Sequence, residues 1–242
     1  MPFIFVGMRL FRLPKTIRWI LFSALLLLVL LTVYRVVVYL LFQDDFPGIK
    51  EGCKLAFWYG LRFDLRIIGT ITLLLFLFSF YPGKHYFKSE EGKKVALWIS
   101  GFLVTVTLLL YAADIAYLRN FNQRLNGSII SDLAKNTLKG NVYKTKTDWA
   151  PIAIIIIAFT IMFIFLMNKM HGIINNLKGN ANYVNRLWWQ TILVLFCFLV
   201  IYGGFEKRPL TTSIAAKRLT PSQLALSLNP FESLLSTLPA KK

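Results

Sequence analysis

Long apolar runs separated by short polar segments dominate the chain. A helix needs about 20 apolar residues to cross a hydrocarbon core about 30 Å thick, and runs of this kind recur along the sequence. We expect five membrane-spanning helices, over residues 17–42, 55–81, 95–118, 149–167 and 187–202. The pattern therefore predicts an all-α integral membrane protein, a bundle of five transmembrane helices with short interfacial helices. The transmembrane domain is expected over residues 1–202.

The residues outside these runs add short helices and a tail. Apolar residues at near-helical spacing between 119 and 148 predict a helix on the membrane surface. In the tail, residues 203–242, Thr220 and Pro221 form a cap and first-turn pair for a short helix through Leu228. A second short helix is expected up to Leu238.

Composition agrees with a membrane protein and excludes some other classes. Of 242 residues, 56% are hydrophobic, against roughly 45–50% in a soluble domain. The net charge of +17 comes from Lys and Arg in the segments between spans, where anionic phospholipids are nearer partners than nucleic acid. Cys53 and Cys197 lie far apart in the pattern, so we expect no disulfide and no metal site built on them.

The orientation is predicted from the first span. If the N-terminus is inside, the outer segments carry somewhat more Lys and Arg than the inner ones, mainly in 119–148 and the tail. The count alone therefore does not decide the orientation. The basic residues before the first span usually dominate insertion, and no small-residue cleavage site follows them. We therefore expect a retained signal-anchor, with a cytoplasmic N-terminus and, after five spans, an extracytoplasmic C-terminus.

Six charged residues lie within or at the ends of the predicted spans, all toward the outer side of the membrane. A charge at the bilayer centre costs roughly 2.5–3.5 kcal/mol, so such residues usually face the bundle interior and form pairs. These candidate site residues are Arg35, Arg62, Asp64, Arg66, Asp114 and Arg119.

Helix geometry restricts how these charges can pair. Arg62 and Arg66 lie one turn apart on one face, whereas Asp64 lies about 200° around the helix from Arg62. Asp64 must therefore find its partner on another helix. Judged by depth alone, Arg35 is the expected partner of Asp64, and Asp114 is the expected counter-charge of Arg62 or Arg66.

Two interpretations of this polar cluster remain open. The charges can be fold-stabilising ion pairs and anchors that reach the interface. Alternatively, because the arginines outnumber the aspartates, the spare guanidinium groups can hold an anionic lipid headgroup in the outer leaflet, since their planar forks grip phosphate through two hydrogen bonds.

No catalytic constellation stands out. His85 and His171 lie in predicted inner loops, where each is expected to be solvated, and neither has a Cys, Asp or Glu array around it. Nucleotide-binding loops, dinucleotide fingerprints and nucleophile elbows are missing from the sequence. We expect no catalytic residue, no metal site and no cofactor in this chain.

Three stretches together resemble one family. They are YGLRFDLRIIG at the second span, ADIAYLRNFNQRLNGSIISDL after the third, and RPLTTSIAAKRLTPSQLALSLNPFESLLSTL in the tail. In order and spacing they resemble the N-terminal membrane region of lipoteichoic acid synthase-like phosphoglycerol transferases, particularly the Gram-negative members labelled sulfatase-family membrane proteins.

The resemblance implies a location in the bacterial cytoplasmic membrane and a role in the cell envelope. In that family, five spans precede an extracytoplasmic hydrolase domain of the alkaline phosphatase and sulfatase type. There a metal-bound threonine takes phosphoglycerol or phosphoethanolamine from a phospholipid and passes it to an acceptor. The tail would then be the connector toward such a domain.

This chain departs from the family because the catalytic threonine and its divalent metal ligands have no matching positions before Lys242. It is then either part of a severed or longer enzyme, with the hydrolase domain as its partner, or a stand-alone membrane protein that binds lipids or a partner protein. A rival from another class is a small transporter or channel subunit that uses Asp64 and Asp114 as ion sites. The odd span number and the lack of an inverted repeat count against that rival.

Overall fold

The computed structural model describes most of the chain as helices. The described residues are 13–43, 52–80, 85–121, 123–127, 149–177, 183–204 and 209–237, and within them no strand occurs. Five helices are long: α2 (Lys15–Phe42), α3 (Cys53–Phe78), α4 (Glu90–Phe121), α7 (Trp149–Asn176) and α8 (Tyr183–Tyr202). Three are short: α9 (Thr212–Ala216), α10 (Pro221–Ser227) and α11 (Pro230–Thr237). The predicted all-helical fold is confirmed for this part of the chain.

Four of the long helices, α2, α4, α7 and α8, are long and apolar enough to cross a membrane. Their large apolar side chains also remain exposed on the outside of the bundle, as lipid-facing side chains would be. Helix α3 has 26 residues, which is sufficient length, but Arg62, Asp64 and Arg66 interrupt its apolar stretch. The four helices support a membrane protein, and the count of five spans stays a prediction.

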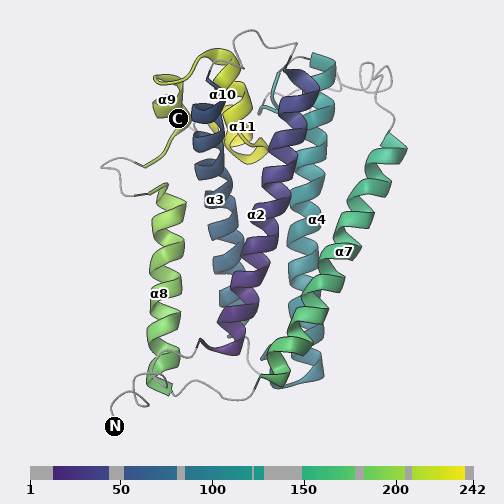
Figure 1. The fold of residues 1–242 in the computed structure, drawn as a ribbon, viewed down its shortest axis with the longest axis vertical. Coiled ribbons are helices and arrows are strands. Elements are labelled where there is room, and N and C mark those ends of the chain that lie inside the picture. Colours follow the sequence, from purple (N-terminus) through teal and green to yellow (C-terminus); the bar gives the residue numbers. More distant parts are fainter. Residues whose placement is uncertain are drawn as a thin grey trace.

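The long helices pack side by side around a shared apolar core (Figure 1). Helix α2 contacts α3 and α7, α3 contacts α8, and α4 contacts α7. The core includes Trp19, which is fully buried and donates from its indole N–H to the carbonyl oxygen of Met167 at 3.1 Å. This bond joins α2 to α7 near one end of the bundle.

Helices α9, α10 and α11 gather at the other end of the bundle (Figure 1). Helix α10 packs on α3 and α2, and α11 packs on α4. We call residues 209–237 the C-terminal tail. Both short helices expected there are confirmed: Thr220 caps α10 in a reciprocal capping box with Gln223, and Pro221 occupies the first turn.

The chain enters this tail through two glycines at the end of α8. Gly203 and Gly204 have φ angles of 97° and 112°, which favour glycine because it lacks a Cβ. Their amides donate to Leu199 and so complete the helix end. A Cβ at Gly203 would also overlap Leu210 in the tail, so the turn needs glycine for both reasons.

The end of the fourth predicted span and the environment of His171 differ from the prediction. The predicted fourth span ends at residue 167, whereas α7 continues to Asn176 because its last turns remain packed on the bundle. His171 therefore lies inside a helix and is buried, so the expectation of a solvated loop residue was wrong. Most of the predicted surface helix between 119 and 148 lies outside the described residues.

Candidate functional site

Arg35 lies at the centre of the contact between the bundle and the C-terminal tail. Arg35 is 2% exposed, and its guanidinium donates to the Asp64 carboxylate, with 2.7 Å between Nη2 and Oδ2. Nη1 donates to the carbonyl oxygens of Leu226 at 2.5 Å and Ser227 at 2.9 Å, and Nη2 also donates to Gly60 O at 3.0 Å. Arg35 thus links α2, α3 and the C-terminal end of α10.

Asp64 completes this contact from α3. Its Oδ2 faces Arg35, while its Oδ1 accepts from the Tyr111 hydroxyl on α4 at 3.1 Å and from the Asn229 amide at 3.3 Å. The expected Arg35–Asp64 pair is confirmed. Because Asn229 also accepts the Glu232 backbone N–H at the start of α11, one carboxylate connects three bundle helices to the tail.

Gly60 makes room for this arrangement. It lies one turn before Asp64 on α3, and a Cβ there would overlap the Arg35 guanidinium. The spacing of Gly60 and Asp64, i and i+4, places both on the same helix face. Local sequence therefore provides a gap and a charge at the point where Arg35 enters.

Arg66 holds the tail from another side of α3. Its Nε donates to Ile201 O at 2.9 Å, near the end of α8, and its Nη1 donates to Leu210 O at 3.0 Å. Nη1 also forms an ion pair with Glu232 of α11, at 2.6 Å. Burial raises the pKa of the Glu232 carboxyl above its ordinary value, and Arg66 offsets only part of this effect.

Arg62 lies on the same face of α3, one turn earlier. Its Nε and Nη2 donate to Gly203 O at 3.2 and 2.6 Å, and its guanidinium lies over the Tyr59 ring at 5.6 Å. Beside it is a groove of about 450 Å³ between α3 and α8. The prediction that Asp64 points away from Arg62 and Arg66 is confirmed, since Asp64 faces α2 and α4 instead.

Asp114 of α4 forms a second buried ion pair, with Arg124. Its Oδ2 accepts from Arg124 and from the Tyr34 hydroxyl, which is 2.6 Å away, and its Oδ1 accepts from Leu125 N at 2.9 Å. Arg124 donates from Nε to Ala225 O of α10 at 2.7 Å. Burial opposes the charge of Arg124, but Asp114 and Tyr34 outweigh it and raise the pKa of this guanidinium.

The expected pairing of Asp114 with Arg62 or Arg66 was therefore wrong. After α4 ends at Phe121 the chain turns back, and Arg124 reaches the carboxylate of Asp114 from only ten residues further along. Depth within a span could not find this partner, because Arg124 lies beyond the span. Arg119, the remaining predicted site residue, is exposed in the last turn of α4.

The four buried or half-buried arginines, Arg35, Arg62, Arg66 and Arg124, form what we call the arginine cluster. All four donate to backbone carbonyl oxygens at or just beyond the C-terminal end of α8 or α10. A helix C-terminus carries partial negative charge and unpaired carbonyl groups, which a cation stabilises. The cluster therefore acts on helix ends and fixes where the tail lies.

The described residues contain no group of three or more His, Cys, Asp or Glu side chains that could hold a metal. Cys53 and Cys197 are free thiols. His171 contacts Tyr86 O through Nε2 at 2.7 Å and stacks on Phe87, whereas His85 is exposed. These contacts give His171 a structural role between α7 and the turn before α4.

Sequence reasoning missed most of the tail's side of the site. Asn229 follows the predicted first tail helix and precedes Pro230, and this pair predicts only the end of that helix. Its side chain caps α11 and also reaches Asp64. The available signal was the Asn-Pro pair, which predicts a cap but says nothing of a contact with a distant helix.

Comparison of the chain with models of known families, with curated proteins and with solved structures found no match. The function must therefore be inferred from the fold and from the contacts between the bundle and its tail.

Proposed function

We propose that this protein is the membrane module of a lipoteichoic acid synthase-like phosphoglycerol or phosphoethanolamine transferase, which anchors and orients an extracytoplasmic hydrolase domain. The module would cross the cytoplasmic membrane five times, with α3 as the second span in addition to the four apolar helices. The resemblance of three stretches suggests the family, and the four apolar helices support the membrane location.

The observation that carries the proposal is the fixed position of the C-terminal tail. The arginine cluster, Asp64 and Asn229 join α9–α11 to the bundle through buried hydrogen bonds and ion pairs. A connector that merely tethers a domain needs no such contacts, because flexible linkers span distance without order. A docked tail would instead set the angle and height of the domain that follows it.

The contacts of Arg62 and Arg66 with α8 and the tail favour this role over the gripping of a lipid phosphate. The outer-leaflet headgroup role expected for the polar cluster of the six predicted site residues stays a prediction. The transporter alternative draws no support from Asp64 and Asp114, since both carboxylates are already paired with arginine and tyrosine.

The test measures how tightly the tail is held. In a chain carrying Cys53→Ser and Cys197→Ala, spin labels at Lys217→Cys on the tail and Ser89→Cys at the opposite end of the bundle report one long distance. Both positions are exposed. We expect a narrow distance distribution by pulsed electron spin resonance in lipid nanodiscs.

Arg66→Gln removes contacts with α8, Leu210 and Glu232 at once, so we expect a clearly broader distribution. Arg119→Gln is the matched control, since it deletes one arginine at the same end of the bundle from an exposed position, and it should leave the width unchanged. A broad distribution in the parent protein, or equal widths for both variants, would refute the proposed orienting role.

A further inference from the structure

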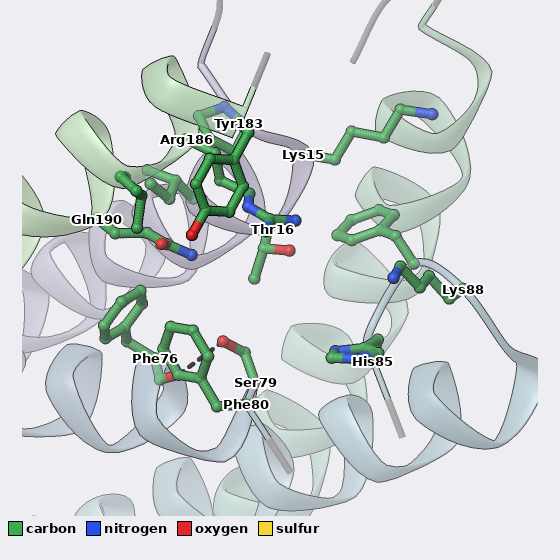
Figure 2. A pocket seen from close by; sticks show the side chains of 14 residues that line it. Lys15, Thr16, Phe76, Ser79, Phe80, His85, Lys88, Tyr183, Arg186 and Gln190 are labelled. Atoms are coloured by element: carbon green, nitrogen blue, oxygen red, sulfur yellow. Dashed lines mark hydrogen bonds between the residues drawn. The ribbon is translucent and has the colours of Figure 1, made fainter. Parts of the chain in front are cut away.

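A cavity of about 430 Å³ lies at the end of the bundle opposite the C-terminal tail. It is formed where the start of α2, the end of α3, the turn before α4 and the start of α8 converge (Figure 2). Small-molecule sites typically occupy about 300–1,000 Å³. None of the residues discussed for the arginine cluster reaches it.

The lining of this cavity is basic. It includes Lys15, Lys88 and Arg186 together with His85, and none of its 14 lining residues is acidic. Lys15 donates to Asn175 O at 2.8 Å, and the Arg186 guanidinium lies over the Tyr183 ring at 5.5 Å. Positive charge gathered around one concave space favours an anionic ligand.

Neutral polar and apolar groups share the cavity with these charges. Figure 2 shows Arg186 and Thr16 pointing toward the space between α8 and α2, with His85 on the opposite side. The side chains of Phe76, Phe80 and Leu187 line the rest. A ligand that fits has an anionic head and an apolar part, so a plain inorganic anion would leave the apolar wall unused.

The depth of the cavity corresponds to a membrane interface. The apolar runs of α2 and α8 begin here and that of α3 ends here. Tyr183 and Trp188 are 66% exposed beside it, as expected of aromatic residues at headgroup level. Lys and Arg at this level attract anionic lipid headgroups.

We infer that this cavity binds the phosphodiester headgroup of an anionic phospholipid from the leaflet at the Lys15 end, with the acyl chains running along α3 and α8. Arg186 and Lys88 contact the phosphate, and Thr16 and Gln190 meet the polar part of the headgroup. The phenyl rings of Phe76 and Phe80 cover the first methylenes. This site is separate from the tail and does not depend on the proposed function.

The test uses native mass spectrometry of the full chain in nonionic detergent, with phosphatidylglycerol and phosphatidylcholine of identical acyl chains. We expect the parent protein to bind phosphatidylglycerol at least tenfold more tightly than phosphatidylcholine. The double variant Lys88→Gln, Arg186→Gln should lose at least tenfold of the phosphatidylglycerol affinity. Soluble glycerol 3-phosphate, tested up to millimolar concentration, reports whether the phosphate alone is sufficient.

The matched control is Lys94→Gln, Lys169→Gln, which removes two exposed charges at the same end of the bundle outside the cavity. General attraction to the protein surface would weaken equally in both double variants, and that result would overturn the inference. So would binding of glycerol 3-phosphate with the same residue dependence but no preference for phosphatidylglycerol, since the cavity would then take a water-soluble phosphate.

If the double variant fails to fold, Arg186→Lys keeps the charge but loses the planar fork. We expect this variant to bind phosphatidylglycerol several-fold more weakly, and unchanged affinity would contradict the assigned contact.

Discussion

Gly60 and Arg35 depend on each other at the scale of single residues. Arg35 passes over α3 at Gly60, which has no side chain, and its donors reach Asp64 and three backbone carbonyls. A buried arginine is tolerated only when its charge and its N–H groups are satisfied. The missing Cβ of Gly60 is therefore part of the ion pair.

We expect Gly60→Ala to destabilise the protein by about 1–3 kcal/mol, since overpacking of this size has that cost. The added methyl group would displace Arg35 from Asp64. Thermal unfolding in detergent measures the effect. Gly172→Ala in α7 is the control, because a Cβ there meets nothing within 4 Å.

The control should be neutral or stabilise the protein by up to about 1 kcal/mol, as alanine favours a helix over glycine. Equal effects of the two substitutions would show that the Gly60 site adapts to a side chain. The proposed dependence of the Arg35–Asp64 pair on Gly60 would then be wrong.

The same two residues show what sequence reasoning can reach at this scale. Charge depth found the Arg35–Asp64 pair, because a charge in an apolar span must seek a partner at its own level. It failed for Asp114, whose partner Arg124 lies outside any span. The sequence gives no sign of the role of Gly60, since only a three-dimensional contact reveals the lack of space.

At the scale of elements, α11 is attached to α3 through the Glu232 carboxyl group, whose buried environment disfavours its charge. Burial raises the pKa of Glu232, and the ion pair with Arg66 lowers it only in part. The folded state thus binds this proton more tightly than the unfolded state does. The stability contributed by the group is present below the unfolded value, about 4.3, and is lost as the pH rises through the folded value.

We therefore expect the melting temperature of the parent protein to fall relative to that of Glu232→Gln as pH rises from about 4. Glutamine carries no titrating proton, so the variant lacks this contribution to the pH dependence. Melting curves from pH 4 to pH 8, recorded side by side, measure it. A difference that is constant or grows in favour of the parent over this range would contradict the assignment.

Of the short tail helices, α10 and α11 were predictable because their signals are local, whereas α9 was not expected. Thr220 and Pro221 mark the start of α10 by a cap and a fixed φ angle, and both appear as expected. The docking of α10 on α3 and α2 was not predictable. It depends on backbone carbonyl groups, which every residue has and which leave no pattern in the side chains.

At the scale of the whole molecule, the two ends of the bundle differ in charge chemistry. One end buries arginines against helix C-termini and carboxylates, and the other leaves lysine, arginine and histidine around an open cavity. Hydrophobic periodicity predicted the helices well but could not predict this difference. It arises from the tail folding back over one end only.

The expected orientation places the cavity in the cytoplasm-facing half and the tail outside. Alkaline phosphatase, which is active only after export, can be fused after Leu177, Gly127 or Lys242 in three separate chains. We expect activity for the Gly127 and Lys242 fusions and none for the Leu177 fusion, because Leu177 directly follows α7, which returns to the cavity end. Activity for the Leu177 fusion and none for the other two would show the opposite orientation.

The arginine cluster contacts the tail mainly through main-chain oxygen atoms, those of Leu210, Ala225, Leu226 and Ser227, beside the Glu232 carboxylate. Recognition of this kind is largely indifferent to the identity of the amino acids that present the carbonyls. Many residues of α9 and α10 are therefore free to change without loss of the attachment, provided that the helix ends stay in the same places. The bundle constrains the backbone path of the tail and leaves most of its side chains unconstrained.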